Sequence, residues 1–424
     1  MPRAPGSTPG GVPREPGSRA RVVVFSELYW PEDTSTGFFL TGIAEGLAAE
    51  REVLVLCAQP TYRQRGLRAP RRESRHGVEI LRVSSTTFPR ERAAGRVINS
   101  LTMAGSLFAQ AVWRLRATDQ VLVVTNPPLL PYVVVLAARL RRARVALLVH
   151  DVYPEVLEVA GVVPAGGFVA RIVRRMARWL YRAVDQVVVL GRDMARLMAG
   201  YVDAPSRVTV IPNWGDVDEI TPGPREGNPL LARLRLQGTF VVQWLGNMGR
   251  THALEDVLHS AVRLGERRDI HFLLVGEGAK RAWVEAEVRR RGLANVTVLP
   301  SCERADLPLH LAACDLSVIA FRPGMAGVSV PSRLYNVLAS GRPVLAAAEA
   351  DSELCRVVDE ERVGWTVPPG ASDAMAAAIA TAAATDPAAR SAMGARARRA
   401  AEGRYSRGAV LREWRAFFDG DWRG

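Results

Sequence analysis

The strongest constraint on this chain is a repeated alternation of short Val- and Leu-rich runs with longer stretches of helical spacing. In the first half of the chain, the apolar runs predict strands at Arg21–Ser26, Glu52–Cys57, Gln120–Thr125, Val145–His150, Gln186–Leu190 and Thr209–Ile211. Helical spacing predicts helices between them, the first at Phe38–Ala49. Strands this uniformly apolar are covered on both faces, which is typical of a parallel sheet between two layers of helices. The pattern predicts a doubly wound α/β domain.

A second block of the same kind follows a break rich in Pro and Gly at residues 212–229, which we interpret as an interdomain linker. Beyond it, strands are predicted at Thr239–Leu245, His271–Val275, Val296–Leu299, Leu316–Ala320 and Pro343–Ala346, and helices at Ala253–Leu264, Ala279–Arg291, Ser332–Ser340 and Asp373–Ala384. The length of 424 residues agrees with two domains, because single cores rarely grow beyond about 250–300 residues.

We therefore predict two Rossmann-like domains, 21–211 and 230–404, that face each other across a cleft. The remaining segment, 405–424, contains a predicted helix at Ser406–Phe418 that would pack back on the first domain. Sheets of this kind bind their ligands outside the carboxyl ends of the strands. Functional residues are therefore expected directly after the predicted strands.

The first 20 residues differ in composition from the rest of the chain. Residues 1–20 are rich in Pro, Gly, Ser and Arg and lack an apolar stretch, so we expect a disordered tail and no signal peptide. No charge-free run in the chain reaches the ~20 apolar residues that a membrane-spanning helix requires. We expect a cytoplasmic protein, soluble or peripheral to a membrane. The four cysteines show no C-x-x-C pair and no zinc spacing, so we expect reduced thiols and no metal.

The chain carries a formal net charge of +13, and nearly all of its positive charge is arginine, since Lys280 is the only lysine. Such a surplus favours anionic partners, which are phosphorylated substrates, anionic lipid or nucleic acid. The arginines are spread over many predicted helices, and no nucleic-acid-binding motif is present. Nucleic acid is therefore not an expected partner.

A glycine-containing loop, Gln243–Arg250 (QWLGNMGR), begins in the first predicted strand of the second block and continues past its end. Gly246 and Gly249 would allow backbone N–H groups to approach a phosphate, and the following helix would offer its positive N-terminal end. Arg250 would add a charge-assisted contact. A tight strand-to-helix turn without a ligand is the alternative.

The segment Val330–Asn336 (VPSRLYN) leads into a predicted helix. Arg333 and Asn336 are three residues apart and therefore share one helical face. A guanidinium one turn away from an amide would suit a diphosphate together with a ribose diol. A solvated arginine on the surface is the alternative.

Four motifs occur in a fixed order: Tyr29–Gly37 (YWPEDTSTG), Ile211–Asp216 (IPNWGD), Leu245–Gly249 (LGNMG) and Pro331–Val344 (PSRLYNVLASGRPV). With this order and spacing, the chain resembles retaining glycosyltransferases of family 4, which have the GT-B fold. The resemblance is to the subgroup that builds colanic acid, O-antigen and related surface glycans, and it extends from about residue 21 to residue 420.

The resemblance implies roles for individual positions. It assigns contact with a nucleotide-sugar donor to Gly37, Gly246, Asn247, Met248, Arg250, Gly276, Glu277, Gly278, Val328, Arg333 and Asn336. His150 matches the active-site histidine of the family, which touches the transferred sugar, and Asp151 is the second catalytic candidate. Glu155 is a candidate on the acceptor side. A histidine that only bonds to Asp151 or Glu155, and carboxylates that only brace their loop, are the alternatives.

The chain departs from the family pattern at two places. The family's Glu-x7-Glu pair is absent, with Val328 and Asn336 in its positions, and a common basic pair is replaced by Asn247 and His252. These departures leave the identity of the donor and the contacts to its sugar undetermined. Two other functions therefore stay under consideration: a nucleotide-sugar epimerase with the same fold, and a non-catalytic partner subunit that binds a nucleotide sugar.

The expected reaction moves a sugar from a nucleoside diphosphate to a hydroxyl of a glycan or lipid-linked acceptor, and retention at the anomeric carbon is implied by the family. Arginine and backbone N–H groups would stabilise the leaving diphosphate. No Asp-x-Asp motif occurs at the candidate loops, so neither a metal nor another cofactor is expected.

Two segments are candidates for contact with an anionic membrane surface. Segment Phe168–Val184 predicts a basic amphipathic helix with aromatic residues on its apolar face. Segment Arg90–Arg116 has arginines at both ends and an apolar middle. Core-packing helices with solvated arginines are the alternative for both segments.

Overall fold

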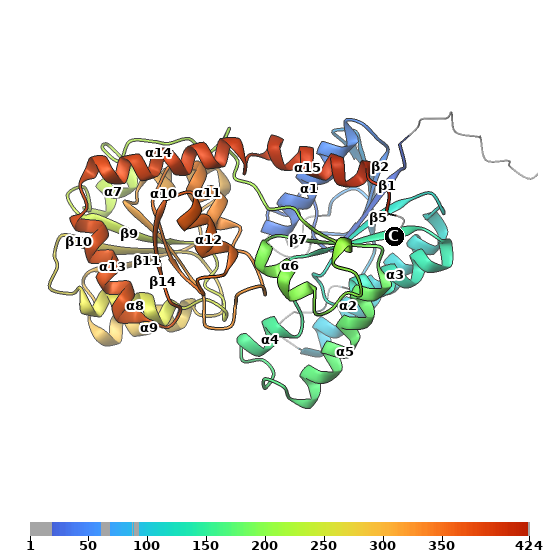
Figure 1. The fold of residues 1–424 in the computed structure, drawn as a ribbon, viewed down its shortest axis with the longest axis horizontal. Helices are drawn as coiled ribbons and strands as arrows, with labels where there is room; N and C mark the ends of the chain where they lie inside the picture. Colours follow the sequence, from blue (N-terminus) through green and yellow to red (C-terminus); the bar gives the residue numbers. More distant parts are fainter. Residues whose placement is uncertain (1–18, 61–67, 87, 89–92, 423–424) are drawn as a thin grey trace, which may run out of the picture.

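The computed structural model describes residues 19–60, 68–86, 88 and 93–422. The predicted disorder of the tail therefore lies, up to residue 18, outside the described residues. Two α/β domains lie side by side and are joined by two crossings of the chain (Figure 1). Within the described residues, no helix is long and apolar enough to cross a membrane.

The N-terminal domain contains an eight-stranded sheet in the order β3-β4-β2-β1-β5-β6-β7-β8. All neighbouring strands are parallel except the hairpin of β3 and β4. The central strands are Val- and Leu-rich and fully covered, as their composition predicts. The strands are β1 (Val22–Ser26), β2 (Val53–Ala58), β3 (Arg72–Arg75), β4 (Val78–Val83), β5 (Gln120–Val124), β6 (Arg144–Val149), β7 (Gln186–Val189) and β8 (Val208–Val210).

The C-terminal domain contains a six-stranded parallel sheet in the order β11-β10-β9-β12-β13-β14. This is the strand order of dinucleotide-binding folds, and its direction reverses between β9 and β12. Loops at the carboxyl ends of those two strands are therefore placed to form a binding site. The strands are β9 (Phe240–Leu245), β10 (Ile270–Val275), β11 (Val296–Leu299), β12 (Leu316–Ala320), β13 (Val344–Ala347) and β14 (Gly364–Val367).

Helices cover both faces of each sheet, so the prediction of two doubly wound α/β domains is confirmed (Figure 1). Those of the N-terminal domain are α1 (Ser35–Ala48), α2 (Ala93–Arg114), α3 (Leu130–Arg141), α4 (Glu155–Val159), α5 (Phe168–Ala183) and α6 (Arg192–Met198). Those of the C-terminal domain are α7 (Pro229–Leu234), α8 (Leu254–Arg263), α9 (Arg281–Arg291), α10 (Leu307–Ala312), α11 (Arg333–Ala339), α12 (Glu353–Glu360), α13 (Ser372–Ala384) and α14 (Pro387–Gly403).

The two crossings between the domains lie next to each other. The backbone N–H of Gly215, in the linker, donates a hydrogen bond of 2.9 Å to the carbonyl of Tyr405. After the second crossing, α15 (Arg407–Asp419) packs against α1 of the N-terminal domain (Figure 1). A Cβ atom on Gly46 of α1 would lie 2.6 Å from Leu411 of α15, so this glycine permits the close approach of the two helices. We retain 21–211, 230–404 and 405–424 as the proposed units.

Several elements were not predicted from the sequence. Strand β3 has the sequence RESR and lies at the sheet edge with alternating exposure, so it lacks the apolar run of a buried strand. Helix α14 is rich in Ala and Arg, and its buried face consists only of Gly and Ala, so it lacks a stripe of large apolar residues. Strands β4 and β14 and helices α7 and α12 were also missed. Helix α1 begins at Ser35, three residues before the predicted Phe38, because the Thr34 side chain accepts a hydrogen bond from the N–H of Gly37.

Candidate functional site

Arg333 is the first residue of α11, and its guanidinium lies over the ring of Trp244 in β9, 3.9 Å from the ring centroid. Both terminal nitrogens of the guanidinium are buried and have no hydrogen-bonding partner among the described residues. Burial without a counterion lowers the pKa of Arg333 to about 9. Buried charges are normally paired, so a cation of this kind indicates a site for an anion.

The loops after β9 and β10 lie against each other beside this guanidinium. The N–H of Met248 donates to the carbonyl of Glu277 (2.7 Å), and the N–H of Lys280 donates to the carbonyl of Met248 (2.9 Å). The contact depends on glycine, because a Cβ atom on Gly276 would lie 1.9 Å from the carbonyl oxygen of Gly246. A Cβ atom on Gly246 itself would lie 3.6 Å from the guanidinium of Arg333. Backbone of the glycine loop is therefore next to the unpartnered cation.

The other predicted donor residues of these loops differ in exposure. Asn247 and Arg250 are exposed at the loop surface. The side chain of Met248 is fully buried in the core of the C-terminal domain, so only its backbone is available to a ligand. A Cβ atom on Gly278 would lie 2.5 Å from the Asn247 side chain, so this glycine also belongs to the contact between the loops. Glu277 forms an ion pair with Arg281.

His252 contacts Trp244 and was noted in the sequence only as the replacement of a basic residue. Its ring meets Trp244 edge-on at 5.4 Å between centroids and stacks on Phe321 at 5.3 Å. Burial, with the nearby charges of Arg333 and Lys280, lowers the pKa of His252 well below its ordinary value. His252 is therefore neutral at pH 7 and packs against Trp244, the ring that lies under the guanidinium. The residue in the sequence that indicates this aromatic contact is Trp244, near the end of the strand before the glycine loop.

The two positions of the missing Glu pair take different roles. Val328 is buried, and its carbonyl accepts a 3.0 Å hydrogen bond from the N–H of Val152 in the N-terminal domain. Asn336 is half-buried, one turn after Arg333 on α11. Position 328 therefore joins the domains through its backbone, while Asn336 shares the helix face of the cation.

The N-terminal domain contributes the start of α1 to the same region. The hydroxyl of Ser35 lies 3.0 Å from the hydroxyl of Ser332, the residue before Arg333. A Cβ atom on Gly37 would lie 2.5 Å from the carbonyl oxygen of Glu32, so the turn into α1 requires glycine. The structure thus brings the loop that carries Gly37 close to α11, although the two are about 300 residues apart in sequence.

His150 follows β6 at the domain boundary. Its carbonyl accepts a 3.1 Å hydrogen bond from the hydroxyl of Ser329, and the next residue, Asp151, pairs with Ser329 as an isolated antiparallel bridge. The Nε2 atom of His150 is buried and has no hydrogen-bonding partner within the described part of the chain. Burial lowers the pKa of His150 to about 4 and raises the pKa of Asp151. His150 is therefore a neutral imidazole at pH 7 with one free ring nitrogen.

Glu155 is occupied by contacts within the N-terminal domain. One carboxylate oxygen accepts a short hydrogen bond from the hydroxyl of Tyr201 and lies 3.4 Å from Arg174. The other oxygen is buried and has no partner in the described residues. These contacts agree with the alternative in which Glu155 braces its loop. No group of three or more His, Cys, Asp or Glu side chains in the described ranges is arranged to hold a metal ion.

Comparisons with known proteins give the same class that the fold and the site define. The family described as a glycosyl transferase 4-like domain matches residues 36–214, and the family described as glycosyl transferases group 1 matches residues 239–385. The chain is 34% identical over 295 residues to the probable glycosyltransferase WbjE of Pseudomonas aeruginosa, which covers 69% of this chain and 74% of that protein.

Two further proteins extend the likeness over more of the chain. The putative colanic acid biosynthesis glycosyl transferase WcaI of Escherichia coli (strain K12) is 27% identical over 374 residues, 85% of this chain and 91% of its own length. The crystal structure of Anabaena Alr3699/HepE in complex with UDP and glucose superposes with a TM-score of 0.71 at 18% identity, over 94% of this chain and 99% of that one.

The protein is a glycosyltransferase of the GT-B fold. It belongs to glycosyltransferase family 4, in the colanic-acid and O-antigen type of bacterial surface-polysaccharide enzymes. The family and fold predicted from the four motifs are thereby confirmed, and the general function is sugar transfer in bacterial polysaccharide biosynthesis.

Proposed function

We propose that this enzyme transfers a hexosyl or related sugar from a nucleoside-diphosphate sugar to a hydroxyl of a glycan or lipid-linked acceptor, with retention at the anomeric carbon. The observation that carries the proposal is the guanidinium of Arg333, which is buried on Trp244 without a hydrogen-bonding partner among the described residues, beside the loop of Gly246. A diphosphate would supply the missing counterion, and its negative charge increases as the sugar departs.

The other residues of the site fit steps of the same reaction. The free Nε2 atom of His150 would contact a hydroxyl of the transferred sugar. Because this imidazole is neutral at pH 7, it adds no positive charge beside a sugar that itself becomes positive. In this proposal Arg333 supplies the charge that stabilises the leaving diphosphate, and no step requires a metal ion. Binding of UDP and glucose by Alr3699/HepE supports a nucleotide-sugar donor for this chain.

The test is a thermal-shift panel of UDP-, GDP-, ADP- and dTDP-sugars on the full chain and on Arg333→Ala. A ligand at about 100 times its Kd stabilises the native state by roughly 2.7 kcal/mol, so the correct donor raises the Tm. We expect one nucleotide class to raise the Tm of the wild type and to have little effect on the variant. Equal shifts in both proteins would reject Arg333 as a donor ligand.

Product analysis separates this function from the two alternatives. A transferase consumes the donor only when an acceptor is present, apart from slow hydrolysis. An epimerase would convert the donor without an acceptor, and a non-catalytic subunit would bind the donor and convert nothing. Sugar transfer to added acceptor glycan therefore supports the proposal, whereas either other result contradicts it.

We also propose that α5 docks the enzyme on an anionic bilayer from the cytoplasmic side. Phe168 is 71% exposed, and Val169, Ile172, Met176 and Trp179 are also exposed on this helix. Four arginines, Arg171, Arg175, Arg178 and Arg182, accompany these apolar side chains along the helix. Apolar residues enter the interface while arginines pair with anionic headgroups, each contributing about 1 kcal/mol. The docked enzyme would then meet a lipid-linked acceptor. Exposed apolar residues of α2 (Val97, Ile98, Leu101 and Trp113) are a second candidate surface.

A further inference from the structure

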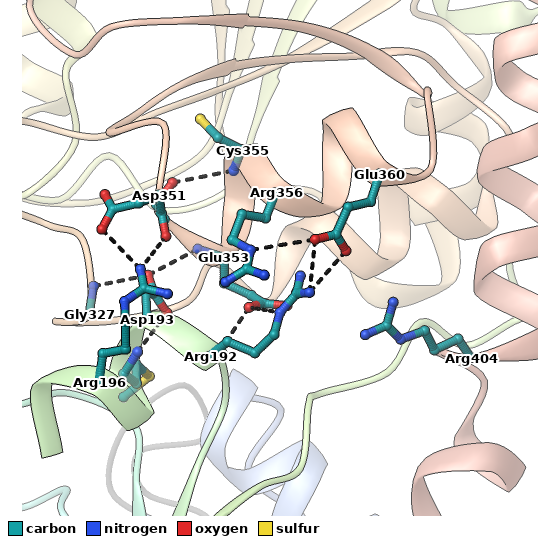
Figure 2. A network of polar contacts seen from close by, with 12 residues as sticks. Arg192, Asp193, Arg196, Gly327, Asp351, Glu353, Cys355, Arg356, Glu360 and Arg404 are labelled. Atoms are coloured by element: carbon teal, nitrogen blue, oxygen red, sulfur yellow. Dashed lines mark hydrogen bonds and ion pairs between the residues drawn. The ribbon is translucent and has the colours of Figure 1, made fainter. Parts of the chain in front are cut away.

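Four residues connect the two domains through polar contacts next to the candidate site. Arg192 and Asp193 lie at the start of α6 in the N-terminal domain, and Gly327 and Glu353 belong to the C-terminal domain (Figure 2). We call these four residues the interdomain clasp. None of them was singled out in the sequence.

Asp193 is a buried carboxylate, 4% exposed, that accepts its hydrogen bonds from backbone N–H groups. One oxygen accepts from the N–H of Met194 at 2.7 Å. The other accepts from the N–H groups of Gly327 (2.9 Å) and Glu353 (3.0 Å), both in the opposite domain. A carboxylate this deeply buried is stable only when it is hydrogen-bonded, and two of its three hydrogen bonds come from the opposite domain.

Glu353 makes the reciprocal contact from the other side. It is 5% exposed, and its carboxylate accepts from the backbone N–H of Arg192 at 2.9 Å and from the Arg192 guanidinium at 2.9 and 3.1 Å. Each domain therefore places a carboxylate at the first turn of a helix of the other domain, where backbone N–H groups lack partners within the helix. Figure 2 shows both carboxylates between α6 and α12.

The clasp ends at the segment that meets His150. Gly327 immediately precedes Val328 and Ser329, the residues that bond to the backbone at the end of β6. Gly327 has a φ of +76°, and a Cβ atom there would lie 2.9 Å from the carbonyl oxygen of Asp193 and 3.1 Å from Leu197. Segment 327–329 thus contacts α6 on one side and the residues that follow β6 on the other.

We propose that Asp193 is a positioning residue that holds segment 327–329 against the strand end carrying His150 and Asp151, so that the clasp keeps the two halves of the site in register. The role in turnover rests on the proposed function, because it assumes that His150 contacts the donor sugar. The structural part does not depend on any substrate.

A second ion pair across the same boundary provides a matched control. Arg196, also on α6, lies 2.9 Å from Asp351 of the C-terminal domain, but the two side chains are 47% and 70% exposed. Exposed pairs of this kind contribute little, because water and salt screen them. Asp351→Asn therefore removes an interdomain ion pair of similar length without touching segment 327–329, while Arg196 keeps its 2.6 Å hydrogen bond to the backbone carbonyl of residue 351.

The experiment is amide hydrogen exchange on the full chain without ligand, comparing the wild type, Asp193→Asn, Gly327→Ala and Asp351→Asn. Asp193→Asn preserves shape but removes one acceptor oxygen, and Gly327→Ala pushes the same segment away from α6. We expect both to speed exchange at least tenfold in segments 150–153 and 326–330, with β10 unchanged, whereas Asp351→Asn matches the wild type. Asp193→Asn and Gly327→Ala change the two opposite sides of the same hydrogen bond. If only one of them folds, that variant alone is sufficient for the test.

Two results would overturn the proposal: wild-type exchange at 150–153 in the variants, or equal acceleration in β10, which indicates global loosening. Steady-state kinetics add a second readout when kcat is calculated for the folded fraction of each variant, so that a simple loss of native enzyme does not lower it. We expect kcat to fall at least fivefold in Asp193→Asn while KM for the donor stays within threefold, since the donor groups of the C-terminal domain are intact. Exchange requires no substrate, so this proposal and the proposed function can fail independently.

Discussion

Arg333 and Trp244 are stacked with 3.9 Å between the guanidinium carbon and the ring centroid, and this contact replaces the water and counterions that an arginine normally has. A cation over an indole ring gains about 0.5–2 kcal/mol, which is less than the hydration that burial removes. In the proposed function, the fold therefore gives up stability at this position to hold a charge ready for an anion.

Replacing Arg333 by Met should separate stability from activity. The variant removes a buried unpartnered charge and keeps the apolar stem, so we expect the free energy of unfolding to rise by about 1–3 kcal/mol. Donor-dependent turnover should fall at least tenfold, because a charged hydrogen bond of ~1.5–3 kcal/mol is lost. Urea unfolding and initial rates measure the two effects. Arg250→Met, at an exposed position of the neighbouring loop, should change unfolding by less than about 0.5 kcal/mol. A destabilised, fully active Arg333→Met would contradict the interpretation.

Substitutions of Trp244 test the aromatic contact directly. Trp244→Leu removes the ring under the guanidinium, and kcat/KM for the donor should fall about tenfold, the equivalent of ~1.4 kcal/mol of cation–π energy. Trp244→Phe keeps a ring and should lose less than about threefold. Both variants create a cavity, so the difference between them isolates the aromatic contact. Equal losses in Leu and Phe would show that packing alone matters at this position.

His150 predicts a pH dependence of stability. Its pKa is lowered to about 4 in the folded protein, while the unfolded chain takes up the proton near the ordinary value of 6.5. Between these values the unfolded state binds more protons, so stability is lost as the pH falls from 6.5 towards 4. From pH 7 to pH 5 this residue should account for a loss of about 2 kcal/mol. Urea unfolding at both pH values should show that the free energy of unfolding falls by about 2 kcal/mol less in His150→Asn than in the wild type. An equal fall in both proteins would show that folding does not lower the pKa of His150.

Gly276 should not tolerate even a methyl group. A Cβ atom would lie 1.9 Å from a backbone oxygen of the glycine loop, which cannot move without separating the loops after β9 and β10. Gly276→Ala should lower the free energy of unfolding by about 2–4 kcal/mol and abolish the Tm shift by donor. Gly292→Ala is the control, because this glycine also has a positive φ of +62°, but a Cβ atom there would meet no described atom within 4 Å beyond its chain neighbours. Its effect should be about 1 kcal/mol, with the donor shift intact.

Docking through α5 can be measured by vesicle sedimentation. Wild-type protein should bind vesicles of phosphatidylcholine with phosphatidylglycerol and be released by salt, because the attraction to the headgroups is screened. The double variant Phe168→Ser with Ile172→Ser removes two exposed apolar side chains, and binding should fall at least tenfold. Trp283→Ser on α9 of the C-terminal domain is the control and should bind as the wild type does. Unchanged binding of the double variant would rule out α5 as the docking helix.

Much of the architecture was predictable because periodicity is a local property. Val- and Leu-rich runs such as β1 and β5 are typical of strands covered on both faces, and the Pro- and Gly-rich linker divides the runs of the chain into two blocks. Edge elements such as β3 escaped prediction, because half-exposed residues carry no apolar pattern. The contact between the backbones of Gly246 and Gly276 was not predicted, since in the sequence Gly246 was assigned to the approach of a phosphate.

The sequence by itself therefore determined the family, the two-domain fold and the motif that carries Arg333, because each rests on short local patterns and on their order along the chain. Only the tertiary structure showed that the guanidinium of Arg333 lies on Trp244 without a partner in the described part of the chain, that His252 is neutral, and that Asp193 reaches Gly327. Whether a side chain is buried, and which groups it contacts, depends on residues that are distant in the sequence. Burial and these contacts together set the charge state of each group, which spacing along a chain cannot show.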